Sequence, residues 1–354
     1  MYSESDIDGA IAAGMISPDA AEGLRQHVAA QRRAPAVDEE SFRLLTGFND
    51  IFVSIAIGLL LAAIAAIGGQ ISPYLSAPLV AATAWGLAEY FTRTRRMALP
   101  SILLLIAFVG GVAATLAIPF GENAEAFGGW LKSVSSEERV QVAIVSAIAA
   151  AIAAVTAAAA WIHWRRFTVP ITVAAGAVAV VAVVLSLVIG LIPAARSAIY
   201  PLVLLAGVGL FAFAMRWDMS DPERRTRRSD VAFWLHLAAA PMIAHALFNL
   251  LGVFSGTMDA GRAVVVLLLY IAFALVALAV DRRALLVSSL AYVLYALYAL
   301  FEQAGAVELS AGFTGLVIGS ALLLLSAFWH RARARVVAQL GGAGRHLPPV
   351  ALAA

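Results

Sequence analysis

The chain has 354 residues, of which 62% are hydrophobic and 13% are charged, and its formal net charge is +2. Soluble globular proteins contain roughly 45–50% hydrophobic and about 25% charged residues, so the composition predicts an integral membrane protein. The small net charge argues against nucleic-acid binding. The absence of cysteine excludes disulfides, thiolate metal sites and cysteine nucleophiles.

Residues 1–46 are polar and are predicted to form a cytosolic helical hairpin followed by a linker. Gly14 is expected to end the first helix in a left-handed conformation, and Ser17 is expected to cap the second helix. The acidic N-terminus has no early apolar run and does not read as a cleavable signal peptide. Because membrane insertion needs no such hairpin, we expect residues 1–46 to bind a cytosolic protein, to mediate self-association or to pack under the bundle.

Residues 47–330 are predicted to form an all-α, polytopic transmembrane bundle. The apolar runs have close to the roughly 20 residues that a helix needs to cross a bilayer core. Residues 331–354 are predicted to be a basic and disordered cytosolic tail. About ten spans are expected, at residues 50–69, 73–91, 98–118, 140–162, 168–190, 197–217, 231–254, 262–280, 284–302 and 311–329.

The distribution of basic residues predicts the orientation of these spans. With both termini in the cytoplasm, all but four of the 24 basic residues lie on the cytoplasmic side, as the positive-inside rule requires. The four exceptions are Lys132, Arg139, Arg196 and Arg262. The most basic loop, residues 219–230, is interpreted as an orientation signal, and contact with anionic lipid or a cytosolic partner is the alternative.

Sequence signatures of soluble enzymes are missing. There is no HExxH, GxSxG or P-loop lysine motif, so a non-enzymatic protein without metal or cofactor is expected. Gly315 and Gly319 form a GxxxG pair, which permits close approach of helices. We interpret the pair as packing inside the bundle, with a homodimer seam as the alternative.

Polar side chains within the predicted spans are the candidate functional residues, because ionisable groups in a membrane are costly and mark functional sites by default. His245 and Asn249 share one helix face, and Tyr298 and Glu302 share another. Counted from the starts of the seventh and ninth spans, the two pairs lie at equal depths. They are therefore predicted to form one polar cluster if those faces meet.

This cluster has two interpretations. It either relays protons through the histidine, or it only ties neighbouring helices together by hydrogen bonds. His236 and Glu89 lie near the cytoplasmic ends of their spans and are secondary candidates, with a pairing between them as one possibility.

Two segments carry a resemblance to a known group. Residues 10–28, AIAAGMISPDAAEGLRQHV, and residues 42–61, FRLLTGFNDIFVSIAIGLLL, are similar to the helical hairpin and first span of bacterial predicted polytopic membrane proteins of unknown function. The resemblance implies a bacterial inner (plasma) membrane location. It transfers no activity and no functional residue.

Two functions are consistent with these features. The first is a non-enzymatic inner-membrane protein in the lipid bilayer, whose head at residues 1–46 serves interaction or assembly. The alternative is a proton-coupled secondary transporter of a small solute, with its polar site on the seventh and ninth spans.

Overall fold

The computed structural model describes residues 4–32, 48–222, 224, 226–253, 259–303, 310–341 and 347, and these residues contain no strand. The chain is therefore all-α, as the sequence predicts. The helices are α1 (Glu4–Ala12), α2 (Pro18–Arg32), α3 (Phe48–Ile71), α4 (Ser76–Ala88), the π-helical η1 (Glu89–Thr94), α5 (Ala98–Glu122), α6 (Ala124–Val134), α7 (Glu138–Phe167), α8 (Ile171–Leu191), the 3-10 helix η2 (Pro193–Ala198), α9 (Ile199–Met219), α10 (Arg227–Leu250), α11 (Ala260–Val280), α12 (Ala284–Gln303), α13 (Ser310–Ala327) and α14 (Trp329–Gln339).

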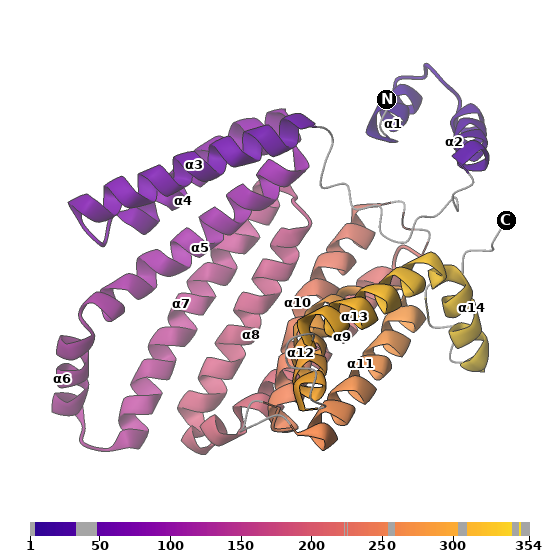
Figure 1. Cartoon of the computed structure of the whole chain (residues 1–354). Coiled ribbons are helices and arrows are strands. Elements are labelled where there is room, and N and C mark those ends of the chain that lie inside the picture. The colour runs from indigo at the N-terminus through magenta and orange to yellow at the C-terminus, as the bar shows by residue number, and fades with distance from the viewer. Residues whose placement is uncertain are drawn as a thin grey trace.

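Helices α1 and α2 form the predicted hairpin. Gly14 has a φ of 70° in the turn between them, and the Ser17 hydroxyl accepts a hydrogen bond from the Ala20 amide at 3.1 Å. An ion pair between Arg25 and Asp8 at 2.9 Å joins the two helices. In Figure 1 the hairpin lies apart from the membrane helices. The predicted linker, residues 33–46, lies outside the described residues.

Eight of the ten predicted spans are single helices that are long and apolar enough to cross a membrane. The chain is therefore a multi-pass integral membrane protein. The span predicted at 311–329 coincides closely with α13, and the chain bends by 76° at its end, between α13 and α14. The span predicted at 73–91 is divided between α4, which has 13 residues, and the π-helical η1. Both segments are helical as predicted, but the one at 73–91 is not a single regular α-helix.

Helix α10 is the centre of the C-terminal half, because it packs against α8, α9 and α12. The largest apolar core forms around it and includes Ile243, Phe248 and Val293. Helices α7 and α8, α9 and α10, and α11 and α12 pack as consecutive pairs, and the contact between α8 and α10 joins the two halves of the bundle (Figure 1).

Several glycines allow helices to approach closely, and Gly111 and Gly207 are two of them. A Cβ atom on Gly111 would lie 2.9 Å from the Ala81 side chain, and one on Gly207 would lie 3.0 Å from the side chains of Ile243 and Met242. Gly315 and Gly319 differ, because an added Cβ atom would meet nothing within 4 Å. The expectation that this GxxxG pair packs inside the bundle is thus not met within the described residues, since no neighbouring helix approaches that face.

The predicted tail is not disordered from residue 331 onward. Helix α14 continues to Gln339, and its Trp329 and Arg333 are buried. Hydropathy alone missed this helix because basic residues alternate with small ones along it, while its buried contacts come from elements distant in sequence. Most residues beyond Gly341 lie outside the described part of the chain.

Candidate functional site

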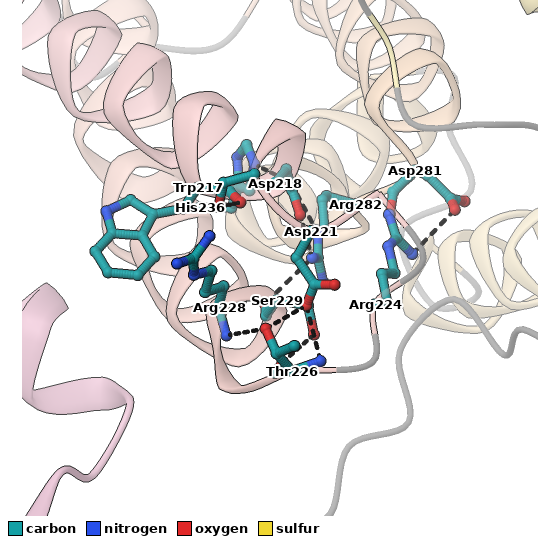
Figure 2. A network of polar contacts seen from close by, with 11 residues as sticks. Trp217, Asp218, Asp221, Arg224, Thr226, Arg228, Ser229, His236, Asp281 and Arg282 are labelled. Atoms are coloured by element: carbon teal, nitrogen blue, oxygen red, sulfur yellow. Dashed lines mark hydrogen bonds and ion pairs between the residues drawn. The ribbon is translucent and has the colours of Figure 1, made fainter. Parts of the chain in front are cut away.

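Several buried charged groups gather at the end of the bundle that carries the loop between α9 and α10. Asp218 near the end of α9, His236 in α10 and Arg282 in the turn after α11 point toward one another (Figure 2). Their side chains are at most 4% exposed. Three helices that are separate in sequence are thus joined by one buried carboxylate.

Asp218 makes its contacts through both carboxylate oxygens. Arg282 Nη2 donates to Asp218 Oδ1 at 2.5 Å, and Arg282 Nε lies 3.3 Å from Oδ2. His236 Nε2 is 2.8 Å from the same Oδ2. Arg282 also donates to the main-chain carbonyl of Ser229 at 3.2 Å, so the first turn of α10 is tied to the same guanidinium.

Asp281 forms the second part of this network, one residue before Arg282. It ends α11 in a left-handed conformation with a φ of 59°. The Trp329 indole N–H donates to its Oδ1 at 2.9 Å, and its carboxylate pairs with Arg224 at 3.0 Å and with Arg333 at 3.4 Å. Asp281 therefore attaches α14 and the α9–α10 loop to the turn between α11 and α12.

We call these residues the charge cluster: Asp218, Arg224, His236, Asp281, Arg282, Trp329 and Arg333.

The electrostatics of the charge cluster favour a structural role. Burial lowers the pKa of Arg224, and the nearby Asp281 carboxylate opposes that shift; a guanidinium nevertheless stays protonated in proteins. Asp281 faces the guanidiniums of Arg224 and Arg333, and Asp218 faces that of Arg282, so both carboxylates are paired with cations inside the protein. No group of three or more His, Asp or Glu side chains able to hold a metal ion occurs among the described residues.

The loop beside the charge cluster is ordered by a separate carboxylate. Asp221 Oδ2 accepts hydrogen bonds from the Thr226 amide at 2.9 Å and from the Thr226 hydroxyl at 2.8 Å. The Thr226 hydroxyl in turn caps α10 by accepting from the Arg228 amide at 3.2 Å. This capping fixes where α10 begins, and with it the position of His236 two turns later.

The predicted cluster of His245, Asn249, Tyr298 and Glu302 is only partly assembled. Asn249 Nδ2 lies 3.1 Å from His245 Nε2 and 2.9 Å from the His245 carbonyl oxygen. Helices α10 and α12 do meet, but His245 Nδ1 lies 2.8 Å from the hydroxyl of Tyr292. Tyr298 and Glu302 are exposed side chains further along α12.

The tyrosine that contacts His245 lies six residues earlier in α12 than the predicted Tyr298. The predicted depths put Val231 and Ala284 at the same level. His236 and Arg282 instead contact the same oxygen of Asp218, so the start of α12 is level with the middle of α10. Six residues correspond to about 9 Å of helix rise. Tyr292, rather than Tyr298, is consequently the tyrosine at the depth of His245.

The secondary candidates His236 and Glu89 do not pair with each other but with different residues. His236 pairs with Asp218. The Glu89 carboxylate accepts from Arg166 Nε at 2.8 Å and from Arg166 Nη2 at 3.0 Å, and Arg93 lies 3.3 Å away. Glu89 therefore ties the end of α4 to the end of α7, and it does not form the considered pair with His236.

Sequence reasoning missed most of the charge cluster. Asp218, Asp281 and Arg282 stand at the ends of apolar runs, where charged residues are normally read as solvated orientation signals. A usable signal was present in two short stretches. Each of RWD (216–218) and VDRR (280–283) places a carboxylate within two residues of an arginine at the same end of the bundle.

Comparison of the chain with protein-family models, curated proteins and solved structures gives no match.

Proposed function

We propose that this protein is a non-enzymatic membrane protein whose α1–α2 hairpin binds another protein or a second copy of the chain. One observation carries the proposal: the hairpin is ordered by its own contacts, yet it presents large apolar side chains to solvent. Met15 is 79% exposed and Leu24 is 48% exposed. A protein partner that covers them would remove this apolar surface from water.

The size of the hairpin supports this reading. A unit of two short helices is too small to bury a substantial core, and Ala21 is its one fully buried apolar residue among those described. Helices α1 and α2 pack mainly on each other in the described part of the chain. Exposed apolar surface on such a unit is typical of an interaction site.

The charge cluster supports a non-enzymatic role for the bundle. Its carboxylates and guanidiniums bond to one another and are almost fully buried, so they are not presented to a substrate. The same arrangement stabilises the end of the bundle that the positive-inside rule places in the cytoplasm. We place the protein in the bacterial inner membrane, with both termini and the hairpin in the cytoplasm.

The test compares two substitutions on α2 in the full-length protein. Leu24→Glu adds a carboxylate to the exposed apolar surface, and Gln26→Glu adds the same charge at an exposed polar position two residues away. The native mass in nanodiscs and the set of proteins cross-linked in cells are measured for both. We expect Leu24→Glu to lose an assembly that Gln26→Glu retains. Identical masses and cross-links for wild type and Leu24→Glu would contradict the proposal.

A second candidate, a proton-coupled transporter of a small solute, is favoured by the contact between His245 and Tyr292. It places a titratable side chain between α10 and α12, and histidine changes charge near neutral pH. In proteoliposomes that enclose a pH-sensitive dye, solutes that move protons would be sought with wild type, His245→Ala and Tyr292→Phe. The transporter hypothesis expects His245→Ala to abolish coupled flux with little change in melting temperature. Loss of folding without a separable loss of flux would count against it.

A further inference from the structure

Three exposed arginines lie in the last turn of α7 and the first turn of α10, and one hydrogen bond connects these two ends. Arg165 is in the last turn of α7, and Arg227 and Arg228 begin α10. Arg227 Nη1 donates to the Thr168 hydroxyl at 2.8 Å, which connects α10 to the turn between α7 and α8. We call Arg165, Arg227 and Arg228 the arginine rim.

The arginine rim differs from the charge cluster in having no carboxylate partner within the described residues. Arg165 stacks over the Trp161 ring at 5.2 Å, and Arg227 bonds to a neutral hydroxyl. The guanidinium of Arg228 lies beside Trp217, at the edge of the network in Figure 2. Two neighbouring acids are engaged elsewhere, Asp218 with Arg282 and Asp221 with Thr226. The exposed Asp230 in the first turn of α10 adds one negative charge beside three arginines, so the rim carries a net positive charge.

Aromatic rings mark the depth of the arginine rim in the membrane. Trp164, Trp217 and Trp234 pack against one apolar cluster formed by α8, α9 and α10. Tryptophan is enriched where lipid headgroups meet the hydrocarbon core. The first turns of α8 and α10 lie at this same end, and the positive ends of their helix dipoles add to the field of the arginines. Guanidiniums bind phosphate through paired, charge-assisted hydrogen bonds, and phosphate is the anionic group that lipid headgroups carry at this depth.

We propose that the arginine rim is a binding site for the phosphate headgroup of an anionic phospholipid, whose acyl chains lie against the apolar surface beside Trp217. The lipid bridges α7 and α10, and hence the two halves of the bundle. A free phosphate ion lacks the chains that would contact this surface. An acidic protein segment would bind the guanidiniums without needing the hydrocarbon depth that the tryptophans mark.

The test measures lipid binding to the full-length, delipidated protein by native mass spectrometry. Phosphatidylglycerol and phosphatidylcholine are titrated separately, for wild type, for Arg227→Gln/Arg228→Gln and for the control Arg331→Gln/Arg335→Gln. The control removes two exposed arginines from α14, so the change in net charge is the same. Loss of two interfacial arginines is expected to weaken phosphatidylglycerol binding about 30-fold, while phosphatidylcholine binding and the control stay unchanged.

Three results would overturn the proposal. The first is equal affinity of wild type and Arg227→Gln/Arg228→Gln for phosphatidylglycerol. The second is an equal loss in the α14 control, which shows a general effect of charge. The third is full competition by inorganic phosphate, which shows an ion site that does not need the lipid. If Arg227→Gln/Arg228→Gln lowers the melting temperature in phosphatidylcholine, Arg165→Gln/Arg228→Gln takes its place, because it keeps the bond between Arg227 and Thr168.

Discussion

Replacing Asp218 by asparagine tests whether the charge cluster stabilises the bundle through charge. The substitution keeps the shape of the side chain but removes the negative charge that faces Arg282 and His236. Arg282 then remains as a cation whose side chain is 4% exposed. A buried charge without its counter-charge is strongly destabilising, because it has lost water without gaining a partner.

The magnitude follows from the contacts. Breaking a buried ion pair by removing one partner costs about 3–5 kcal/mol. An exposed ion pair such as that between Glu138 and Arg196 contributes little, because solvent screens both charges. Asp218→Asn is therefore expected to lose about 3–5 kcal/mol of unfolding free energy, whereas Glu138→Gln is expected to change it little.

The assay is reversible unfolding in mixed micelles, followed by tryptophan fluorescence. A double substitution, Asp218→Asn with Arg282→Met, separates charge from packing because it removes both charges and keeps much of the volume. Replacing both members of a buried pair is often close to neutral, so the double variant is expected to be more stable than Asp218→Asn alone. The double-mutant cycle then gives the coupling between the two residues.

Two results would refute this reasoning. If Asp218→Asn unfolds at the same denaturant concentration as Glu138→Gln, the carboxylate does not stabilise the bundle. If the double variant is as unstable as the sum of its two single substitutions, the loss arises from packing or from main-chain bonds and not from an uncompensated charge.

Three further predictions concern packing and local order. Gly207→Ala should lower the melting temperature, because the added Cβ atom would lie 3.0 Å from side chains of α10. The control Gly209→Ala adds a Cβ atom that meets nothing within 4 Å, so it should raise the melting temperature slightly through helix propensity. A higher melting temperature for Gly207→Ala than for Gly209→Ala would contradict the packing at Gly207. Trp329→Phe loses the bond to the Asp281 carboxylate and should increase deuterium uptake in α14, and unchanged uptake would show that the bond does not hold the helix. Gly14→Ala should destabilise the hairpin by about 1 kcal/mol because φ is positive there, and protease cleavage within residues 4–32 should rise relative to Gly9→Ala.

The sequence was sufficient for the membrane class and for eight spans, because a continuous apolar run of bilayer length has few alternatives to a helix. It was less informative where the helix is irregular. Glu89 and the residues after it adopt a π-helical turn in which Glu89 pairs with Arg166 of α7. That pairing depends on a neighbour 77 residues away, which hydropathy does not register.

In the candidate site, too, a contact within one helix could be predicted from the sequence, whereas a contact between two helices could not. Asn249 was correctly placed beside His245, because residues four apart share a helix face. The partner on α12 was not, because relative depth depends on how far the two helices are shifted along each other. His236, near the middle of α10, and Arg282, two residues before α12, contact the same Asp218 carboxylate. Helix α12 therefore begins near the middle of α10, which places Tyr292 rather than Tyr298 opposite His245.

The arrangement around Asp281 also sets an order for biogenesis. The ribosome delivers Arg224 and Asp281 well before it delivers Trp329 and Arg333, which complete the contacts of that carboxylate. A nascent chain that stops short of α14 therefore holds a carboxylate at the membrane surface with part of its partners missing. This end of the bundle can close only after α14 has been made, so a product truncated before Trp329 differs chemically from one that contains α14.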